Sequence, residues 1–435
     1  MRRLETRVLG VDGVVRALER PAAALDPGIH QQVAEILAAV RDKGDAALVE
    51  LTERFDGVRL EPRDLRVTAA EHEAAERLVT EATVAALSYA AARIEAFHRA
   101  SLPRSWSMTD AAGSRLGQDV RPLARVGIYV PGGRAAYPST VLMTAIPARV
   151  AGVKEIVLVS PPAADGSLAP AVLVAARLAG VTEAYRVGGA QAIAALAYGT
   201  ASIPRVDKIV GPGNVYVTLA KGRVFGEVGI DMLAGPSEVV VIADETADPA
   251  FAAADLLAQA EHDPMARAVL LTPSAGLADR VATEIERQLA ALPRRAIAAS
   301  ALAAHGALVV TAGLEEAVEM ANRLAPEHLE LLVADPEALV PHVRHAGAVF
   351  LGAATPEVVG DYVAGPDHVL PTGGTARFAS ALGTEDFVKR LSVIQYSTRG
   401  LREAWPHLAE LARVEGLEGH AAAARARIAT TGDRA

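Results

Sequence analysis

The spacing of apolar residues changes along the chain. From about residue 28 to residue 100, apolar positions recur every three to four residues, as at Val33, Ile36 and Val40. This spacing places apolar side chains on one face of an α-helix and predicts a helical lead-in. After Arg125, short β-branched runs alternate with alanine-rich helical stretches. We therefore expect a helical region followed by an α/β region.

The β-branched runs fall into two series, each predicted to form strands. The first series covers residues 156–159, 184–187, 208–210 and 239–242. The second series covers residues 268–271, 307–310, 329–333 and 348–351. Regular alternation of strand and helix implies right-handed βαβ units and parallel sheets. The pattern predicts an α/β protein with two doubly wound, Rossmann-like lobes.

The same pattern suggests a domain organisation. We expect an N-terminal arm (1–25), a first α/β lobe with the helical lead-in (26–125 and 239–381), a second α/β lobe (126–238) and a helical C-terminal tail (382–435). The tail carries an apolar stripe at Leu408, Leu411, Val414 and Leu417. Such a stripe is too short to form its own core. The tail is therefore expected to pack on the body or on a partner subunit.

Composition narrows the class of protein. A chain of 435 residues is too long for one ordinary core, which agrees with two lobes. No stretch approaches the ~18 consecutive apolar residues of a membrane span. Residues 1–5 include basic side chains but no apolar segment follows, so we expect no secretory signal and a cytoplasmic location. A net charge of −9 with few aromatic residues argues against a nucleic-acid partner and favours a small molecule.

Three glycine-containing segments follow predicted strands, at residues 127–133, 188–191 and 211–214. Open α/β sheets bind ligands at the carboxyl edge of their strands, and glycine lets the backbone approach a ligand closely. None is a full dinucleotide fingerprint, because Tyr216 occupies the position of the third glycine in the last segment. Each segment alone also fits an ordinary turn. Together they indicate one ligand crevice.

A helix is expected to begin at Asp248, the N-cap, with Pro249 in its first position. If this helix runs to His262, then Gln259 and His262 share one face. An amide oxygen and an imidazole at this spacing are able to chelate a metal ion. They also occur as an ordinary solvated pair.

Glu327 and His328 stand side by side immediately before an apolar strand. Neighbouring side chains point to opposite faces of a regular strand, so their joint use requires an irregular backbone, which Pro326 favours. A water-activating carboxylate and a proton-accepting imidazole suit stepwise oxidation. A surface Glu-His pair is the alternative interpretation.

Two further segments contain candidate ligands. Residues 360–372 form a predicted long loop rich in Gly and Pro, and long ordered loops are often functional. In the tail, Glu415 and His420 lie next to Gly416 and Gly419, which are expected to break the helix. This break would turn both side chains toward a neighbour.

Several of these segments, in this order, resemble histidinol dehydrogenase over nearly the whole chain: 127–143, 188–199, 206–221, 230–238, 255–262, 322–331 and 360–372, completed by Glu415 and His420. One departure is Asp367, where the family usually has asparagine. It adds a negative charge beside His368.

The resemblance implies one zinc ion per subunit, with Gln259, His262, Asp361 and His420 as ligands, the last reaching in from the partner in a homodimer. It implies NAD as cofactor, in contact with Tyr129, Gln191 and Asn214. Manganese or cobalt also suit such metal ligands. The implied substrate contacts are Ser237, Gln259, His262, His328, Asp361, His368, Glu415 and His420. The implied catalytic residues are Glu327 and His328.

The implied reaction is NAD-dependent oxidation of L-histidinol through an aldehyde to L-histidine, in histidine biosynthesis. The chain contains no cysteine, so the aldehyde step cannot pass through a thioester and water must add instead. We expect Glu327 to activate that water and His328 to accept the alcohol proton.

Two other functions remain open at this point. One is a related dehydrogenase of another small alcohol, such as a sulfonated diol, expected to lack Glu415 and to differ around His328 and His368. The other is a non-catalytic metal- or nucleotide-binding regulator, against which Glu327 and His328 argue.

Overall fold

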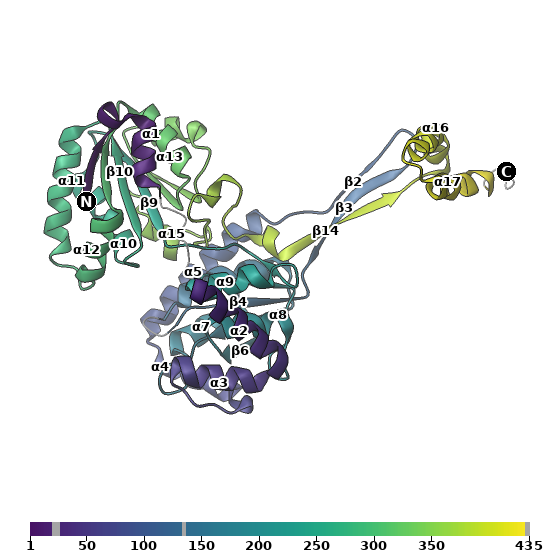
Figure 1. Cartoon of the computed structure of the whole chain (residues 1–435), viewed down its shortest axis with the longest axis horizontal. Coiled ribbons are helices and arrows are strands. Elements are labelled where there is room, and N and C mark those ends of the chain that lie inside the picture. The colour runs from purple at the N-terminus through teal and green to yellow at the C-terminus, as the bar shows by residue number, and fades with distance from the viewer. Residues whose placement is uncertain (20–26, 133–135, 431–435) are drawn as a thin grey trace. The chain divides into compact units, whose positions relative to one another are not determined.

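The structure is a computed structural model that describes residues 1–19, 27–132 and 136–430 (Figure 1). The chain divides into two compact units. The first comprises Met1–Ser101 and Ala124–Phe387, and the second comprises Leu102–Leu123 and Val388–Ala435.

The first unit contains a six-stranded parallel sheet in the order β1-β11-β10-β9-β12-β13. Its strands are β1 (Arg2–Glu5), β9 (Glu238–Ala243), β10 (Arg267–Thr272), β11 (Ala307–Val310), β12 (His328–Leu332) and β13 (Ala348–Leu351). Its helices are α1 (Thr6–Leu18), α10 (Pro249–Ala260), α11 (Ala275–Leu289), α12 (Arg295–His305) and α13 (Leu314–Leu324). Two separate cores, one with α10 to α12 and one with α1 and α13, enclose alternate side chains of the strands. The sheet is therefore doubly wound.

A five-stranded parallel sheet, ordered β6-β5-β4-β7-β8, lies in the same unit. Its strands are β4 (Arg125–Tyr129), β5 (Glu155–Ser160), β6 (Glu183–Arg186), β7 (Lys208–Val210) and β8 (Gly229–Ile230). Its crossover helices are α6 (Pro138–Ala151), α7 (Pro170–Ala179), α8 (Gly189–Tyr198) and α9 (Val215–Val224). The predicted strands and the two parallel α/β lobes are confirmed.

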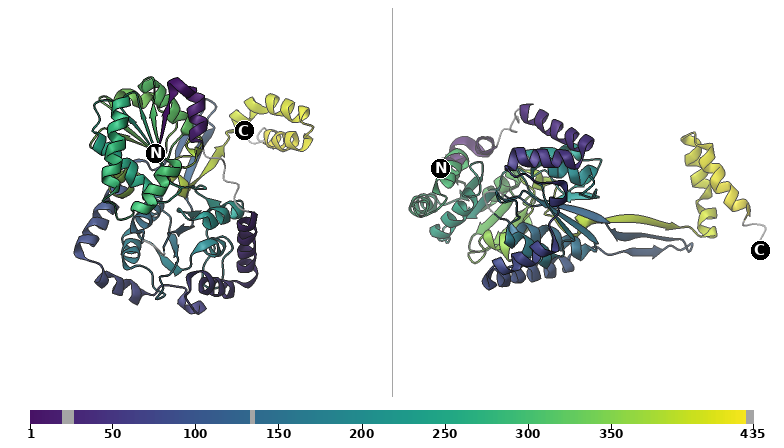
Figure 2. Two further views of the ribbon diagram at one scale, coloured as in Figure 1. Left: turned by 60° about the vertical axis from the view of Figure 1, so that its left-hand side comes forward. Right: turned by 90° about the horizontal axis from the view of Figure 1, so that it is seen from below.

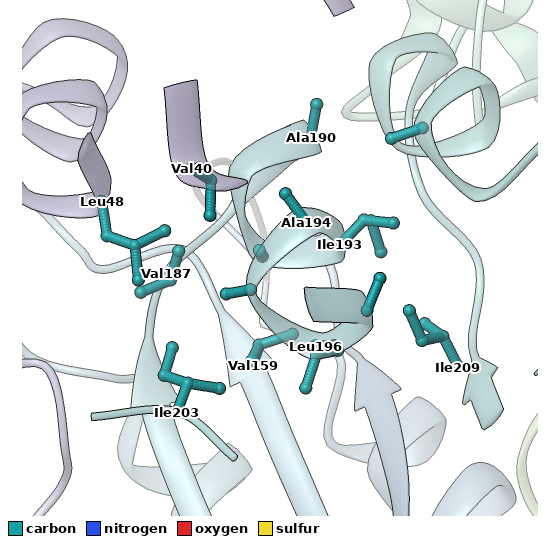
Figure 3. Packing of buried hydrophobic residues seen from close by; sticks show 14 of the residues in the cluster. Val40, Leu48, Val159, Val187, Ala190, Ile193, Ala194, Leu196, Ile203 and Ile209 are labelled. Carbon is teal, nitrogen blue, oxygen red and sulfur yellow. The ribbon is translucent and has the colours of Figure 1, made fainter. Parts of the chain in front are cut away.

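The helical lead-in packs on the crossover helices of the five-stranded sheet. It consists of α2 (Pro27–Lys43), α3 (Asp45–Asp56), α4 (Ala69–Leu78) and α5 (Glu81–Ala100). Val40 and Leu48 are buried in one cluster with Val159, Val187 and Ile193 (Figure 3). The expected grouping with residues 239–381 therefore differs from the structure. An amphipathic helix shows which face is buried, but its sequence does not show which sheet covers that face.

The structure also differs in part from the expected N-terminal arm. Its first residues form β1, which pairs with β11 at the edge of the six-stranded sheet. Residues 20–26, where the arm was expected to meet the first lobe, lie outside the described residues.

The second unit joins two distant parts of the chain. Strands β2 (Trp106–Thr109), β3 (Arg115–Pro122) and β14 (Val388–Gln395) form an antiparallel sheet in the order β14-β3-β2. Helices α16 (Thr398–Val414) and α17 (Glu418–Thr430) follow at one end of this long ribbon (Figure 2). The tail is therefore not helical throughout, because it contains strand β14. This strand pairs with residues that were expected in the first lobe.

Gly416, with φ of +71°, separates α16 from α17 as expected, whereas Gly419 lies inside α17 and does not break it. The remaining short helices belong to the first unit: η1 (Pro62–Asp64), α14 (Pro336–Leu339), η2 (Val340–His342), α15 (Val358–Tyr362), η3 (Thr375–Arg377) and η4 (Thr384–Phe387). Throughout the described part of the chain, every helix is too short or too polar to span a bilayer.

Candidate active site

An irregular backbone precedes Glu327 and His328, as their joint use requires. Helix α13 ends at Leu324, and its C-cap Ala325 has φ of +47° and is the only non-glycine residue with positive φ in the described ranges. Pro326 follows, and β12 begins at His328. Both side chains of the pair are buried, with 6% of Glu327 and 4% of His328 exposed. These values exclude the surface-pair interpretation.

The backbone of Glu238, the first residue of β9, contacts both members of the pair. Its N–H donates to Glu327 Oε2 at 2.9 Å, and its carbonyl oxygen lies 3.2 Å from His328 Nδ1. A carbonyl oxygen only accepts hydrogen bonds, so Nδ1 carries the proton and Nε2 keeps a free lone pair. The Glu238 side chain is held in turn by Arg267 and by the Gly373 N–H. His328 Nε2 is therefore prepared to accept a proton.

Burial governs the protonation of this pair. It lowers the pKa of His328 to about 4, so the imidazole is neutral at neutral pH. Burial also raises the pKa of Glu327 well above its usual range, and the charges of Glu238 and Asp361 add to the effect. A hydrogen bond from the Ser237 side chain opposes that increase. A nearby cation would favour the Glu327 carboxylate, because an opposite charge stabilises the ionised form.

Three side chains meet at a candidate metal site. His262, Glu357 and Asp361 each place one ligand atom within 4.8 Å of the others. Glu357 is the N-cap of α15 and Asp361 follows four residues later, so both lie on one side of this short helix. His328 Nε2 lies 4.0 Å from Asp361 Oδ1. The oxygen and imidazole donors suit a divalent transition metal such as zinc.

Gln259 supports the same assignment, although its helix is shorter than expected. Asp248 caps α10 by accepting the Ala250 N–H at 2.8 Å, as predicted, but the helix ends at Ala260. His262 lies in the turn that follows and is exposed, while Gln259 is fully buried. Neither amide atom of Gln259 has a hydrogen-bond partner among the described residues. A buried amide is expensive to leave unpaired, so a ligand fits here.

His368 is oriented by the segment that carries Asp361. Its Nδ1 lies 2.9 Å from the Asp361 carbonyl oxygen, so Nδ1 donates, and Nε2 lies 3.4 Å from Thr140 Oγ1. The expected loop of residues 360–372 is interrupted at its start, because Asp361 belongs to α15. The Asp361 backbone thus orients His368, and the role of His368 as a substrate contact stays a prediction.

Asp367 contacts a different histidine. Its Oδ1 accepts the Val369 N–H at 2.8 Å, and its Oδ2 lies 4.0 Å from His98 Nε2. Both side chains are buried. Burial raises the pKa of Asp367 well above its usual range and lowers the pKa of His98 to about 4.

The expected cofactor contacts lie at the carboxyl edge of the five-stranded sheet. Tyr129 ends β4, and its hydroxyl accepts the Gly189 N–H at 3.2 Å. Burial raises the pKa of this hydroxyl to about 12. Gln191 is buried in the first turn of α8, and Asn214 caps α9 by accepting the Tyr216 and Val217 N–H groups. Gly133, the last residue of the first glycine segment, lies outside the described residues.

Two implied site residues belong to the second unit. Glu415 is the C-cap of α16, and His420 lies in α17. Their role at the site stays a prediction.

Several carboxyl groups of this region were not predicted from the sequence. Glu357 precedes the expected metal ligand Asp361 by four residues, a spacing that places two side chains on one side of a helix and could have identified Glu357. Glu330 stands inside the apolar strand β12, where a charge is unusual, and its burial together with the carboxyl group of Asp255 raises its pKa to about 9. Glu238 gave no such signal, because it acts on the pair through its backbone.

Comparisons with known proteins agree with this geometry. A family model described as histidinol dehydrogenase matches residues 18–428. The chain is 57% identical over 404 residues to a histidinol dehydrogenase of Synechococcus sp., covering 92% of this chain and 93% of that one. It is 57% identical over 407 residues to one of Geobacillus kaustophilus, covering 93% and 96%. The crystal structure of histidinol dehydrogenase from Elizabethkingia anophelis superposes with a TM-score of 0.95 at 37% identity, covering 100% and 99%.

Proposed function

This chain belongs to the histidinol dehydrogenase family of oxidoreductases, and from that premise we propose that it oxidises L-histidinol through L-histidinaldehyde to L-histidine with NAD and zinc. The observation that carries the proposal is the buried pair Glu327 and His328, held by Glu238 beside the His262, Glu357 and Asp361 group. Such a pair can provide two different groups, an imidazole that accepts a proton and a carboxyl group that activates water.

Gln259, His262 and Asp361, with the partner's His420, would hold one zinc ion per subunit. Zinc, when bound, would orient the substrate through its imidazole and amine nitrogens. The unpaired amide of Gln259 and the converging donors of His262 and Asp361 support this assignment. Ser237, His368 and the partner's Glu415 would complete the contacts to the substrate.

The two oxidations use different residues. In the first, His328 Nε2 takes the hydroxyl proton of L-histidinol while a hydride passes to NAD, which leaves the aldehyde. In the second, Glu327 takes a proton from the water that adds to the aldehyde, and the hydrate gives its hydride to a second NAD. The chain has no cysteine, so a thioester route is excluded. Tyr129, Gln191 and Asn214 would contact the cofactor.

A homodimer with shared sites is part of the proposal. In the second unit, Ile394 is 70%, Leu411 64% and Val414 68% exposed. Leu411 and Val414, three residues apart, share one face of α16, and an exposed apolar face is typical of interaction surfaces. Glu415 follows Val414 directly. We expect a second copy of the chain to cover this surface. A cytoplasmic location also belongs to the proposal, because the reaction consumes NAD.

The reaction is tested by incubating the purified chain with zinc, NAD and L-histidinol. About two NADH per L-histidinol are expected, with loss of activity on chelation and recovery with zinc. One NADH per substrate, or turnover only with another small alcohol, would favour the related dehydrogenase. No reduction with any alcohol would favour a binding protein.

The shared site is tested by mixing subunits that carry Gln259→Ala with subunits that carry His420→Ala. In a heterodimer, one site contains both changes and the other contains neither. Random pairing of equal amounts makes about half of the dimers heterodimers, so recovery of up to about a quarter of the wild-type activity is expected from two inactive parents. A mixture that stays inactive although heterodimers form would contradict sharing.

A further inference from the structure

One buried carboxylate near the metal site has no assigned role. Glu357 is 1% exposed, and both of its carboxylate oxygens are buried without a hydrogen-bond partner among the described residues. A carboxylate that is buried and unpaired is strongly destabilised in its charged form. The local structure therefore lacks a group that would compensate Glu357.

The fold holds Glu357 at this place. Its backbone N–H donates to Glu330 Oε1 at 2.7 Å, which connects the start of α15 to strand β12. Its carboxylate then lies within 4.8 Å of the ligand atoms of His262 and Asp361. Gln259 is a second buried side chain whose polar atoms have no hydrogen-bond partner among the described residues. Glu327 differs, because it accepts the Glu238 N–H.

The net charge of the proposed metal ligands also favours a role for Glu357 at the metal. The ligand set of the proposed function contains one amide, two neutral imidazoles and a single carboxylate, so a divalent cation would keep one excess positive charge. In a buried site, that charge favours a second carboxylate nearby. We propose that Glu357 is a further carboxylate of the metal centre and contributes, with His262 and Asp361, to holding the divalent cation. The inference rests on the zinc requirement in the proposed function.

The test compares two acid-to-amide variants of the full-length chain. Glu357→Gln keeps the size of the side chain and removes its charge. Glu330→Gln is the matched control, because it keeps an oxygen that accepts the Glu357 N–H. We expect zinc to bind about 10- to 100-fold more weakly to Glu357→Gln in competition with a chelator, as is typical for groups around a metal. Glu330→Gln should bind zinc like the wild type.

Unfolding of the metal-free and zinc-loaded proteins separates this role from a structural one. Glu357→Gln removes an uncompensated buried acid, so the metal-free variant should unfold at the same temperature as the wild type or higher. The increase in unfolding temperature caused by zinc should shrink, because it follows zinc affinity. A purely structural Glu357 would lower the metal-free unfolding temperature and leave the zinc-induced increase unchanged.

Cobalt gives an independent readout. The visible absorption of the Co²⁺-substituted protein should change in Glu357→Gln and not in Glu330→Gln. Equal zinc affinity of Glu357→Gln and wild type, or equal losses in both variants, would overturn the proposal. If Glu357→Gln does not fold, Glu357→Asp is used instead, because its shorter side chain moves the carboxylate away from the metal by one methylene. A Glu357→Asp variant that binds zinc as tightly as the wild type would also overturn the proposal.

Oxidation of L-histidinol by the wild type is measured in parallel. If the wild type oxidises L-histidinol and Glu357→Gln binds zinc normally, only the role of Glu357 fails. If the wild type binds zinc through Glu357 but does not oxidise L-histidinol, the proposed function fails and the metal assignment stands.

Discussion

The two parallel sheets of the first unit carry their candidate residues at opposite edges. In the five-stranded sheet, Tyr129, Gly188 and Gly211 follow the carboxyl ends of β4, β6 and β7. In the six-stranded sheet, Glu238 and His328 are the first residues of β9 and β12, so they lie at the amino edge. The carboxyl edge of the five-stranded sheet consists of glycines and backbone groups, whereas the amino edge of the six-stranded sheet carries buried titratable side chains.

This difference shows what the carboxyl-edge rule for open α/β sheets explains. The rule predicts the expected cofactor contacts, because glycines at that edge would let a ligand approach backbone N–H groups. It does not account for the acid-base pair, which needs burial to set the pKa values of Glu327 and His328. The amino edge provides that burial, because Ala325 turns the chain before β12 and Glu238 fixes both side chains.

The largest effect is expected at the amino edge. His328→Asn keeps a donor that can bond the Glu238 carbonyl oxygen but removes the basic Nε2. We expect the rate of L-histidinol oxidation to fall about 10²- to 10⁴-fold, the usual contribution of a positioned base. Single-turnover NADH formation measures this, with zinc affinity as the control. A variant that keeps wild-type rates would place the proton acceptor elsewhere.

A smaller effect is expected at the carboxyl edge, where the backbone matters. Gly211 has φ of +107°, and a Cβ there would lie 2.2 Å from the Tyr129 carbonyl oxygen. Gly211→Ala should therefore displace Tyr129 and raise the KM for NAD more than it changes the single-turnover rate at saturating NAD.

Gly226→Ala is the matched control for this prediction. Gly226 also has positive φ, of +103°, but a Cβ there meets nothing within 4 Å. Both variants carry a backbone strain of roughly 1–3 kcal/mol, so only the clash differs. Equal KM values for NAD in the two variants would show that Tyr129 does not act at the cofactor site.

The smallest effect on activity is expected outside both edges, at Asp367. Asp367→Asn keeps the bond to the Val369 N–H and offers a donor to His98 Nε2, which accepts no hydrogen bond from any described residue of the wild type. The variant should oxidise L-histidinol like the wild type but be more stable by about 1–3 kcal/mol at pH 8, the usual cost of an unpaired buried polar group.

The pH dependence of stability gives the sign of this effect. The folded pKa of Asp367 lies above its unfolded value of 3.8, so folding binds a proton. The stability from this group is fully present below pH 3.8 and is lost as the pH rises through the folded pKa. The advantage of Asp367→Asn, measured by denaturant unfolding, should therefore shrink toward pH 4. An advantage that grows on acidification would contradict this assignment.

Local patterns in the sequence predicted much of the fold. Runs such as residues 156–159 and 329–333 alternate with helices, and this alternation is sufficient to predict parallel sheets. Long-range pairing could not be predicted in the same way. Residues 388–395 pair with residues 115–122 across more than half of the chain, and nothing local in either segment identifies the other.

The candidate site was predictable where its chemistry depends on residue type. Glu327, His328, His262 and Asp361 were found through their side chains and through resemblance. Glu238 was missed because it acts through backbone groups. Glu357 was missed because only the fold shows that it is buried, unpaired and close to His262.

In the proposed reaction, Glu327 serves the aldehyde step and His328 serves the alcohol step. The most direct test is a single-turnover reaction of zinc-loaded Glu327→Gln with L-histidinol and excess NAD, analysed for NADH and for the organic product. We expect about one NADH per site, with L-histidinaldehyde as the product, where the wild type forms two NADH and L-histidine. Equal loss of both steps, or two NADH with L-histidine from the variant, would contradict the division of roles.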